Sequence, residues 1–213
     1  MRESQLTGRL RLRHLQEHTE AVGESMATER TRFQALADPS NATRAVSSFN
    51  LFQTPEPIAD RMAGMLMPLD GLRVLEPSAG LGRLYRAVRL RAACPMVLVE
   101  QSAECAGELY RAIGDDDARL VQADFLACTP ERLGGLFDAV IMNPPFKQGA
   151  DIKHIRHALT MLRPGGRMVA LCASGPRQQA QLRPLADEWH ALPAGSFKSE
   201  GTRVAAALLM FRR

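Results

Sequence analysis

The sequence predicts an α/β fold: a doubly wound, mostly parallel sheet of seven strands with an antiparallel C-terminal hairpin, plus a short helical N-terminal extension. Short apolar runs alternate with segments whose apolar residues have helical spacing. Acidic or amide residues directly follow several of these runs, as they do where parallel strands end beside a ligand. The length of 213 residues accommodates one such domain and a small extension. Together these observations are typical of a parallel sheet with helices on both faces.

The first predicted strand, residues 72–76, leads through a glycine-containing loop into a predicted helix over residues 83–92. Gly80 and Gly82 let the backbone approach a ligand closely. A dinucleotide-binding loop would carry a third glycine three residues after the second, where this chain has Tyr85. This difference argues against a pyrophosphate-bearing cofactor. The acid at the strand end, Glu76, favours a ligand with a positive group such as an ammonium.

Two further acids follow predicted strands. Glu100 ends the strand predicted over residues 96–100, at the distance from the loop where a ribose-binding acid lies in Rossmann-like sheets. The strand over residues 119–122 leads into Asp124, which is placed to meet an adenine amino group. A single acid of this kind is more often a solvated loop end. Three acids at consecutive strand ends favour a ligand site.

The predicted buried strand over residues 137–142 stops at Asn143-Pro144-Pro145-Phe146. Proline lacks a backbone N–H and fixes its own φ, so neither proline continues a central strand. The Asn143 side chain and the Pro144 carbonyl then offer two hydrogen-bond acceptors beside the ring of Phe146. That set suits a planar group with an exocyclic –NH2. The alternative is a strand-ending turn with one core aromatic residue.

The remaining pattern completes the fold. We expect a helix over residues 151–162, a strand over 167–172 and a helix over 176–189. Residues 189–197 and 203–211 are predicted to pair as an antiparallel hairpin across a turn at 198–201. An earlier helix is expected over residues 58–67.

These motifs together resemble the class I S-adenosylmethionine-dependent methyltransferases, in particular the N6-adenine enzymes of phage or prophage type. The resemblance covers residues 49–211 and implies S-adenosylmethionine as the cofactor. It assigns catalysis to Asn143, Pro144, Pro145 and Phe146. Substrate contact is expected from Phe146 and from Lys147, which is placed to meet a backbone phosphate. The expected cofactor-binding residues are Gln53, Thr54, Pro55, Glu76, Pro77, Ser78, Ala79, Gly80, Gly82, Glu100, Gln101, Asp124, Phe125 and Asn143.

The resemblance implies methyl transfer to an exocyclic amino group, with adenine N6 in DNA as the first expectation. An RNA base is the second and a protein glutamine amide the third, because all three present the same planar –NH2. A non-catalytic S-adenosylmethionine-binding partner subunit is a further alternative. The intact Asn-Pro-Pro-Phe argues against it.

Composition sets the remaining expectations. A net charge of +4 and a pI near 9.2 permit nucleic-acid binding without demanding it. The longest apolar run, residues 204–211, is far too short to span a bilayer, so no membrane partner is expected. Four cysteines without metal-ligand spacing predict reduced core thiols in a cytoplasmic protein. His154 and His157 share a predicted helix face, but no third ligand is evident and no metal is expected. The oligomeric state stays open.

Residues 1–47 differ in character from the expected methyltransferase domain over residues 48–213. A short basic run precedes a predicted polar helix over residues 19–37 with few apolar anchors. A basic arm that grips nucleic acid, a dimerisation helix and a loosely ordered tail all fit this pattern. The segment carries no recognisable catalytic motif.

Overall fold

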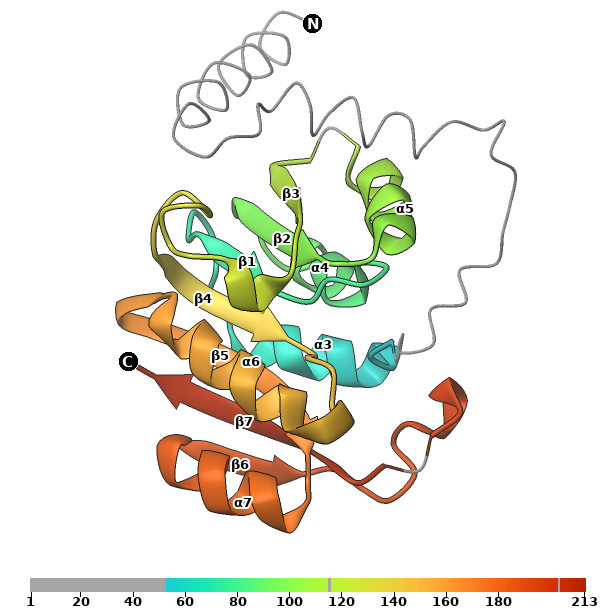
Figure 1. Cartoon of the computed structure of the whole chain (residues 1–213). Helices are drawn as coiled ribbons and strands as arrows, with labels where there is room; N and C mark the ends of the chain where they lie inside the picture. Colours follow the sequence, from blue (N-terminus) through green and yellow to red (C-terminus); the bar gives the residue numbers. More distant parts are fainter. Residues whose placement is uncertain (1–52, 115, 203) are drawn as a thin grey trace, which may run out of the picture. The chain divides into compact units, whose positions relative to one another are not determined.

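Seven strands form one sheet in the computed structural model, which describes residues 53–114, 116–202 and 204–213. The strand order is β3-β2-β1-β4-β5-β7-β6 (Figure 1). Strands β1 to β5 are parallel to one another, and β7 runs antiparallel to both β5 and β6. The predicted mostly parallel sheet of seven strands, with antiparallel strands at the C-terminus, is therefore confirmed. The strands are β1 (Val74–Glu76), β2 (Met96–Glu100), β3 (Ala118–Gln122), β4 (Phe137–Met142), β5 (Leu162–Ala173), β6 (Glu188–Ala191) and β7 (Ala206–Arg212).

The sheet is buried on both faces, which explains why its central strands are continuously apolar. Successive side chains of a strand point to opposite faces. Leu75 and Val140 belong to a core cluster that includes Ile152 and Ile155 from one flanking helix. The residues next to them in sequence, Val74 and Ile141, are equally buried but lie outside that cluster. Both faces therefore require apolar residues.

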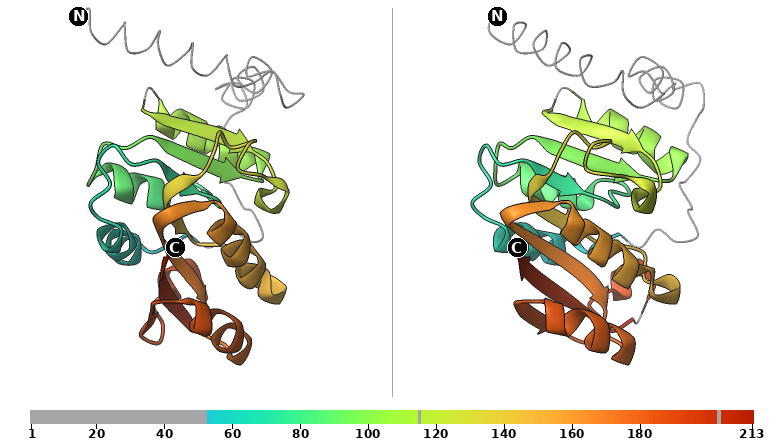
Figure 2. Two further views of the ribbon diagram at one scale, coloured as in Figure 1. Left: turned by 90° about the vertical axis from the view of Figure 1, so that its left-hand side faces the viewer. Right: turned by 60° about the vertical axis from the view of Figure 1, so that its left-hand side comes forward.

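Helices cover the two faces of the sheet (Figure 2). Helices α3 and α4 pack against each other on one face, and α6 lies on the opposite face. The crossovers through α4 and α5 run in the same direction along the sheet, so the right-handed rule places α5 on the face of α4. Helix α7 contacts α6. The helices are α3 (Glu56–Met65), α4 (Arg83–Arg89), α5 (Ala103–Ile113), α6 (Ala150–Thr160) and α7 (Pro176–Leu182).

Three predictions about the elements were wrong or incomplete. The helix expected over residues 176–189 ends at Leu182, because Pro184 removes a backbone donor and restricts the residue before it. The strand expected over residues 189–197 is β6, which stops at Ala191. Residues 192–205 therefore form a long connection in place of a tight hairpin turn. Helix α5 was not predicted.

Some of the sequence-based expectations concern residues that the structure does not describe. The proposed extension over residues 1–47 and the start of the domain at residue 48 are among them. All four cysteines lie in the described part, and each is buried with a free thiol, as expected. None of the described helices is long and apolar enough to cross a membrane.

Candidate functional site

The carboxyl ends of β1 and β4 lie side by side at the point where the strand order reverses direction. The chain runs outward from β1 through β2 to β3 and then returns to β4 on the other side of β1. Open α/β sheets bind ligands at such switch points. A pocket of about 870 Å³ lies here, lined by residues from both strand ends. This volume falls in the upper part of the range of about 300–1,000 Å³ that is usual for small-molecule sites.

Glu76, at the end of β1, is a buried acid facing this pocket. Its side chain is 1% exposed, and its Oε2 atom has no hydrogen-bond partner among the described residues. Burial is the main cause of a pKa well above the usual value of a glutamate, and the negative charge of Glu100 raises it further. A buried carboxylate oxygen without a partner is costly unless a cation or donor reaches it. The donor chemistry therefore fits a ligand with a positive, hydrogen-bond-donating group.

The loop after β1 is held to the end of β2 by Glu100. Its Oε2 accepts a hydrogen bond from the Gly80 backbone N–H at 2.7 Å, and its Oε1 accepts one from the Ser102 N–H at 2.7 Å. Gly80 has a φ of 53°, a conformation that glycine adopts without a steric penalty. Each carboxylate oxygen can accept a second hydrogen bond. Glu100 therefore shapes the loop and still has capacity for ligand hydroxyl groups.

The end of β3 contributes a polar and an aromatic residue. The Asp124 side chain accepts from the Leu126 N–H at 2.9 Å and so caps a short 3₁₀ turn. Phe125 is 3% exposed and packs edge-on against His157, with ring centroids 4.8 Å apart. His154 lies 6.0 Å from the same ring and lines the pocket. Burial lowers the pKa of His154, which favours the neutral imidazole.

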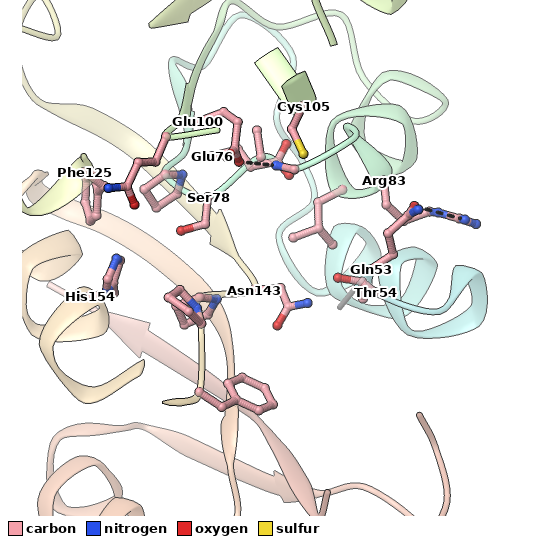
Figure 3. A pocket seen from close by; sticks show the side chains of 18 of the residues that line it. Gln53, Thr54, Glu76, Ser78, Arg83, Glu100, Cys105, Phe125, Asn143 and His154 are labelled. Atoms are coloured by element: carbon pink, nitrogen blue, oxygen red, sulfur yellow. Dashed lines mark hydrogen bonds between the residues drawn. The ribbon is translucent and has the colours of Figure 1, made fainter. Parts of the chain in front are cut away.

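The segment after β4 presents Asn143, Pro144, Pro145 and Phe146 along the pocket wall. All four of Asn143, Ser78, Thr54 and His154 line the pocket. In the view of Figure 3, Asn143 is drawn between His154 and Thr54, with Ser78 above it. The backbone then turns sharply, since Gln148 has a φ of 56° and Gly149 a φ of 77°. Non-glycine residues rarely adopt this conformation, and it turns the chain directly into α6.

Two segments distant in sequence close the pocket. Gln53 and Thr54 precede α3, and Gln53 Oε1 accepts from Arg83 Nη2 at 3.4 Å. On the other side, the connection over residues 192–205 contributes Phe197, Thr202 and Val204. Phe197 is 1% exposed, so its ring is part of the packed wall.

The structure brings most of the predicted site residues into this one pocket. All four residues predicted as catalytic line it, as does Lys147. The predicted cofactor-binding residues also line it, with two exceptions. Pro55 directly precedes α3. Gly82 is the N-cap residue of α4, and a Cβ atom added at Gly82 would lie 2.6 Å from Leu109 Cδ1. Both shape the backbone beside the pocket.

Sequence reasoning missed several lining residues. Leu81, Arg83 and Leu84 lie beside the glycines, and Ser102 lies two residues after Glu100, so their place in the motifs could have identified them. Ala123, directly before Asp124, carries the same kind of signal. The others reach the pocket only through the tertiary fold and carry no local signal: Cys105, His154, Ala173, Phe197, Thr202 and Val204. Over the described ranges, no group of three or more histidines, cysteines and acids could hold a metal ion.

No family model matches the sequence. A search of curated proteins finds a 35% identical stretch of 77 residues in the rRNA N(6)-adenosine-methyltransferase metl-5 of Caenorhabditis elegans. That stretch covers 34% of this chain, and the chain spans only 36% of the relative's length.

Solved structures show the same fold. A protein described as a modification subunit of a type I restriction enzyme from Vibrio vulnificus has a TM-score of 0.63 at 19% identity, covering 88% of this chain and 48% of that chain. A protein described as a class I S-adenosylmethionine-dependent methyltransferase from Listeria monocytogenes has a TM-score of 0.64 at 17% identity, covering 87% of this chain and 68% of that chain. The sheet order and the antiparallel hairpin described above are common to this architecture.

Proposed function

We propose that this protein, which has the Rossmann-like fold of the class I S-adenosylmethionine-dependent methyltransferases, transfers a methyl group from S-adenosylmethionine to adenine N6 in DNA. One observation carries the proposal. A single pocket at the switch point of the sheet is lined both by the acids at the strand ends and by Asn143 to Phe146. Binding and transfer therefore share one site.

The residues present fit the proposed cofactor. S-adenosylmethionine supplies a methyl group activated by a sulfonium, together with an ammonium, a ribose and an adenine. The unpartnered buried oxygen of Glu76 matches the ammonium. Glu100 has acceptor capacity for ribose hydroxyl groups, and Asp124 lies at the next strand end. Thr54, 3% exposed, lines the same pocket.

The proposed chemistry depends on positioning and hydrogen bonding. The lone pair of an adenine amino group is delocalised into the ring, so the nitrogen is a poor nucleophile. Hydrogen bonds from this –NH2 to the Asn143 side-chain oxygen and the Pro144 carbonyl favour a more pyramidal nitrogen and localise the lone pair. Fixed acceptors and alignment in a shielded pocket supply most of the acceleration. Transfer would break the bond between the methyl group and the sulfonium, which would leave as a neutral thioether. The methylated nitrogen would be positively charged and would lose its proton to water, so the site needs no strong base.

A base in a duplex has to leave the stack to reach this pocket, at a cost of a few kcal/mol. Phe146 lies on the pocket wall and is only partly exposed. Stacking on an aromatic ring returns about 1–3 kcal/mol per base. Single-stranded or locally distorted sites are therefore the preferred form of the substrate.

The test is nucleoside mass spectrometry on DNA from a methylation-deficient host that expresses the protein. Asn143→Ala serves as the control and should abolish turnover while cofactor affinity stays within a few-fold. N6-methyladenine with the wild type and none with the variant supports the proposal. Soluble wild-type protein that binds S-adenosylmethionine but leaves DNA unmodified would overturn the DNA assignment.

An RNA adenine is the second candidate substrate. The similarity to an rRNA N(6)-adenosine-methyltransferase favours it. RNA from the same cells, digested and analysed in the same way, separates the two: N6-methyladenosine that depends on Asn143 would assign the activity to RNA. A labelled methyl group that reaches neither nucleic acid would point to the glutamine amide or to a non-catalytic partner subunit. The buried free thiols support a reducing compartment, and we propose the cytoplasm.

A further inference from the structure

The chain is strongly basic on one side of the candidate site. Residues 144–186 contain seven lysines and arginines and one acid, Asp151. Asp151 is 0% exposed, and both of its carboxylate oxygens accept hydrogen bonds from protein groups. It therefore projects little negative field to the surface, and the exposed charges of this stretch are all positive.

Two of the seven cations are engaged at the other end of the strands, away from the pocket. Arg163 forms an ion pair with Asp138, and Arg167 donates to the Leu66 carbonyl, with its Nε at 2.9 Å. Of the other five, four are exposed cations near the pocket, and we call them the phosphate row: Lys147, Lys153, Arg156 and Arg177.

Contacts connect the phosphate row to the pocket. Lys147 lines the pocket directly. Arg177 Nη1, on α7, lies 3.5 Å from the Gln148 carbonyl, on the residue that follows Lys147. Lys153 and Arg156 lie three residues apart on α6, which places their Cβ atoms about 5–6 Å apart on one helix face. Arg156 Nη2 donates to the Gln181 carbonyl of α7 at 3.3 Å.

The members of the phosphate row lack carboxylate partners, whereas several arginines in other parts of the described chain have them. Elsewhere, Arg91 pairs with Asp60, and Arg111 pairs with Glu108. Within the part of the chain that the structure describes, no member of the row forms an ion pair. Unpaired cations in a row beside a pocket provide a field that an extended polyanion can neutralise.

We propose that the phosphate row binds the sugar-phosphate backbone of the nucleic-acid strand next to the target adenine. The proposal rests on the function proposed above and adds where the strand lies: across α6 and α7, on the face opposite α3 and α4 (Figure 2). Phosphate contacts position a strand without reading its sequence. The row therefore supplies affinity and register, and target choice comes from the pocket.

The experiment measures binding of a fluorescein-labelled single-stranded oligodeoxynucleotide by anisotropy at several salt concentrations. Lys153→Gln/Arg156→Gln is compared with Arg61→Gln/Arg111→Gln, which removes two exposed cations from α3 and α5. The row variant should weaken binding at least tenfold at low salt, whereas the control should change it less than threefold. For the row variant, the slope of log affinity against log salt concentration should fall in magnitude by about 1.4, since each of the two lost phosphate contacts on a single strand contributes about 0.7.

Two further variants separate charge from folding. Among the described residues, the Lys153 side chain has no hydrogen-bond or ion-pair partner. Lys153→Glu should weaken binding at least as much as Lys153→Gln. Arg156→Lys keeps the charge and should stay within threefold of the wild type. Poly-glutamate of matched charge should compete poorly; competition equal to that of the oligonucleotide would overturn the proposal in favour of a general acidic partner.

Failure of this inference differs from failure of the proposed function. If the wild type methylates adenine but the row and control variants bind the strand equally, the binding role of the phosphate row is refuted and the proposed function stands. If the wild type binds cofactor and never methylates adenine, the function is wrong, whatever the binding shows. Loss of affinity confined to the row variants supports the inference.

Discussion

The side-chain amide of Gln178 donates hydrogen bonds to both carboxylate oxygens of Asp151, at 3.1 and 3.0 Å. Asp151 Oδ2 also accepts from the Ala173 N–H at 3.0 Å. One buried carboxylate therefore connects the start of α6, the end of β5 and α7. The segment from Phe146 to Ala150 leads directly into this junction, so Asp151 anchors the end of the turn that follows the predicted catalytic residues.

Asp151→Asn should destabilise the protein by about 1–3 kcal/mol, because an acceptor oxygen becomes a donor and leaves a buried N–H group unpaired. Urea unfolding measures the effect, with the exposed Asp117→Asn as control. The variant should also lower kcat more than it raises KM, since it displaces the wall beside Asn143. Equal unfolding midpoints for the two variants would refute this role.

The raised pKa of Glu76 predicts a pH-dependent stability. Because the folded state holds this proton more tightly than the unfolded state, the contribution is fully present below the ordinary value of 4.5 and is lost as pH rises through the raised pKa. The wild-type unfolding free energy without cofactor should fall across that window. Glu76→Gln should show a flatter profile. Parallel profiles would mean that another group carries the dependence.

Proton release on cofactor binding provides a separate test of Glu76. An ammonium beside the carboxylate favours its ionised form and lowers its pKa, so S-adenosylmethionine should displace a proton between pH 4.5 and the raised pKa of the free protein. Calorimetry in two buffers of different ionisation enthalpy counts these protons. Glu76→Gln should release fewer protons and bind at least tenfold more weakly. Unchanged release would place the ammonium elsewhere.

Sequence patterns predicted the site residues that lie where a strand ends, because the end of a strand is visible in the local sequence. Glu76 and Glu100 each end a strand and Asn143 directly follows one, so the short apolar runs and the breaks after them located these residues. Phe197 and His154 escaped prediction because their place in the pocket depends on strand order, which no local pattern encodes. The bounds of β6 were predicted wrongly for a related reason: its residues are not buried in an apolar run and gain their structure by pairing with β7.

A substitution of Phe197 that keeps most of the side-chain volume should affect KM for the substrate more than it affects stability. Phe197→Leu removes the ring from the pocket wall and should raise KM for a nucleic-acid substrate several-fold, with a stability loss of about 1 kcal/mol. Phe211→Leu is the matched control, because Phe211 is also 1% exposed but lies in the core outside the pocket lining. Equal effects on KM would exclude a specific role for the Phe197 ring.

Gly82→Ala tests the cap of α4. The added Cβ would meet Leu109 Cδ1 at 2.6 Å, in a backbone with φ of 78°. Gly71 has a similar φ of 71° with nothing near its Cβ position, so Gly71→Ala reports the backbone cost alone, about 1–2 kcal/mol. Gly82→Ala should cost about 1–3 kcal/mol more from overpacking. Thermal unfolding compares the two, and equal losses would show that Leu109 moves away freely.

The connection over residues 192–205 begins and ends on facing strands. Ala191 pairs with Ala207, and the Leu192 N–H donates to the Ala206 carbonyl at 2.9 Å. Its length and composition can change without a shift in the register of β6 and β7, and the entropic cost of a longer loop grows slowly. Because this connection also forms one wall of the pocket, an engineer could graft in loops from other proteins and select for new substrates while the cofactor half stays intact. The same independence offers evolution a route by which target preference diverges on a constant scaffold.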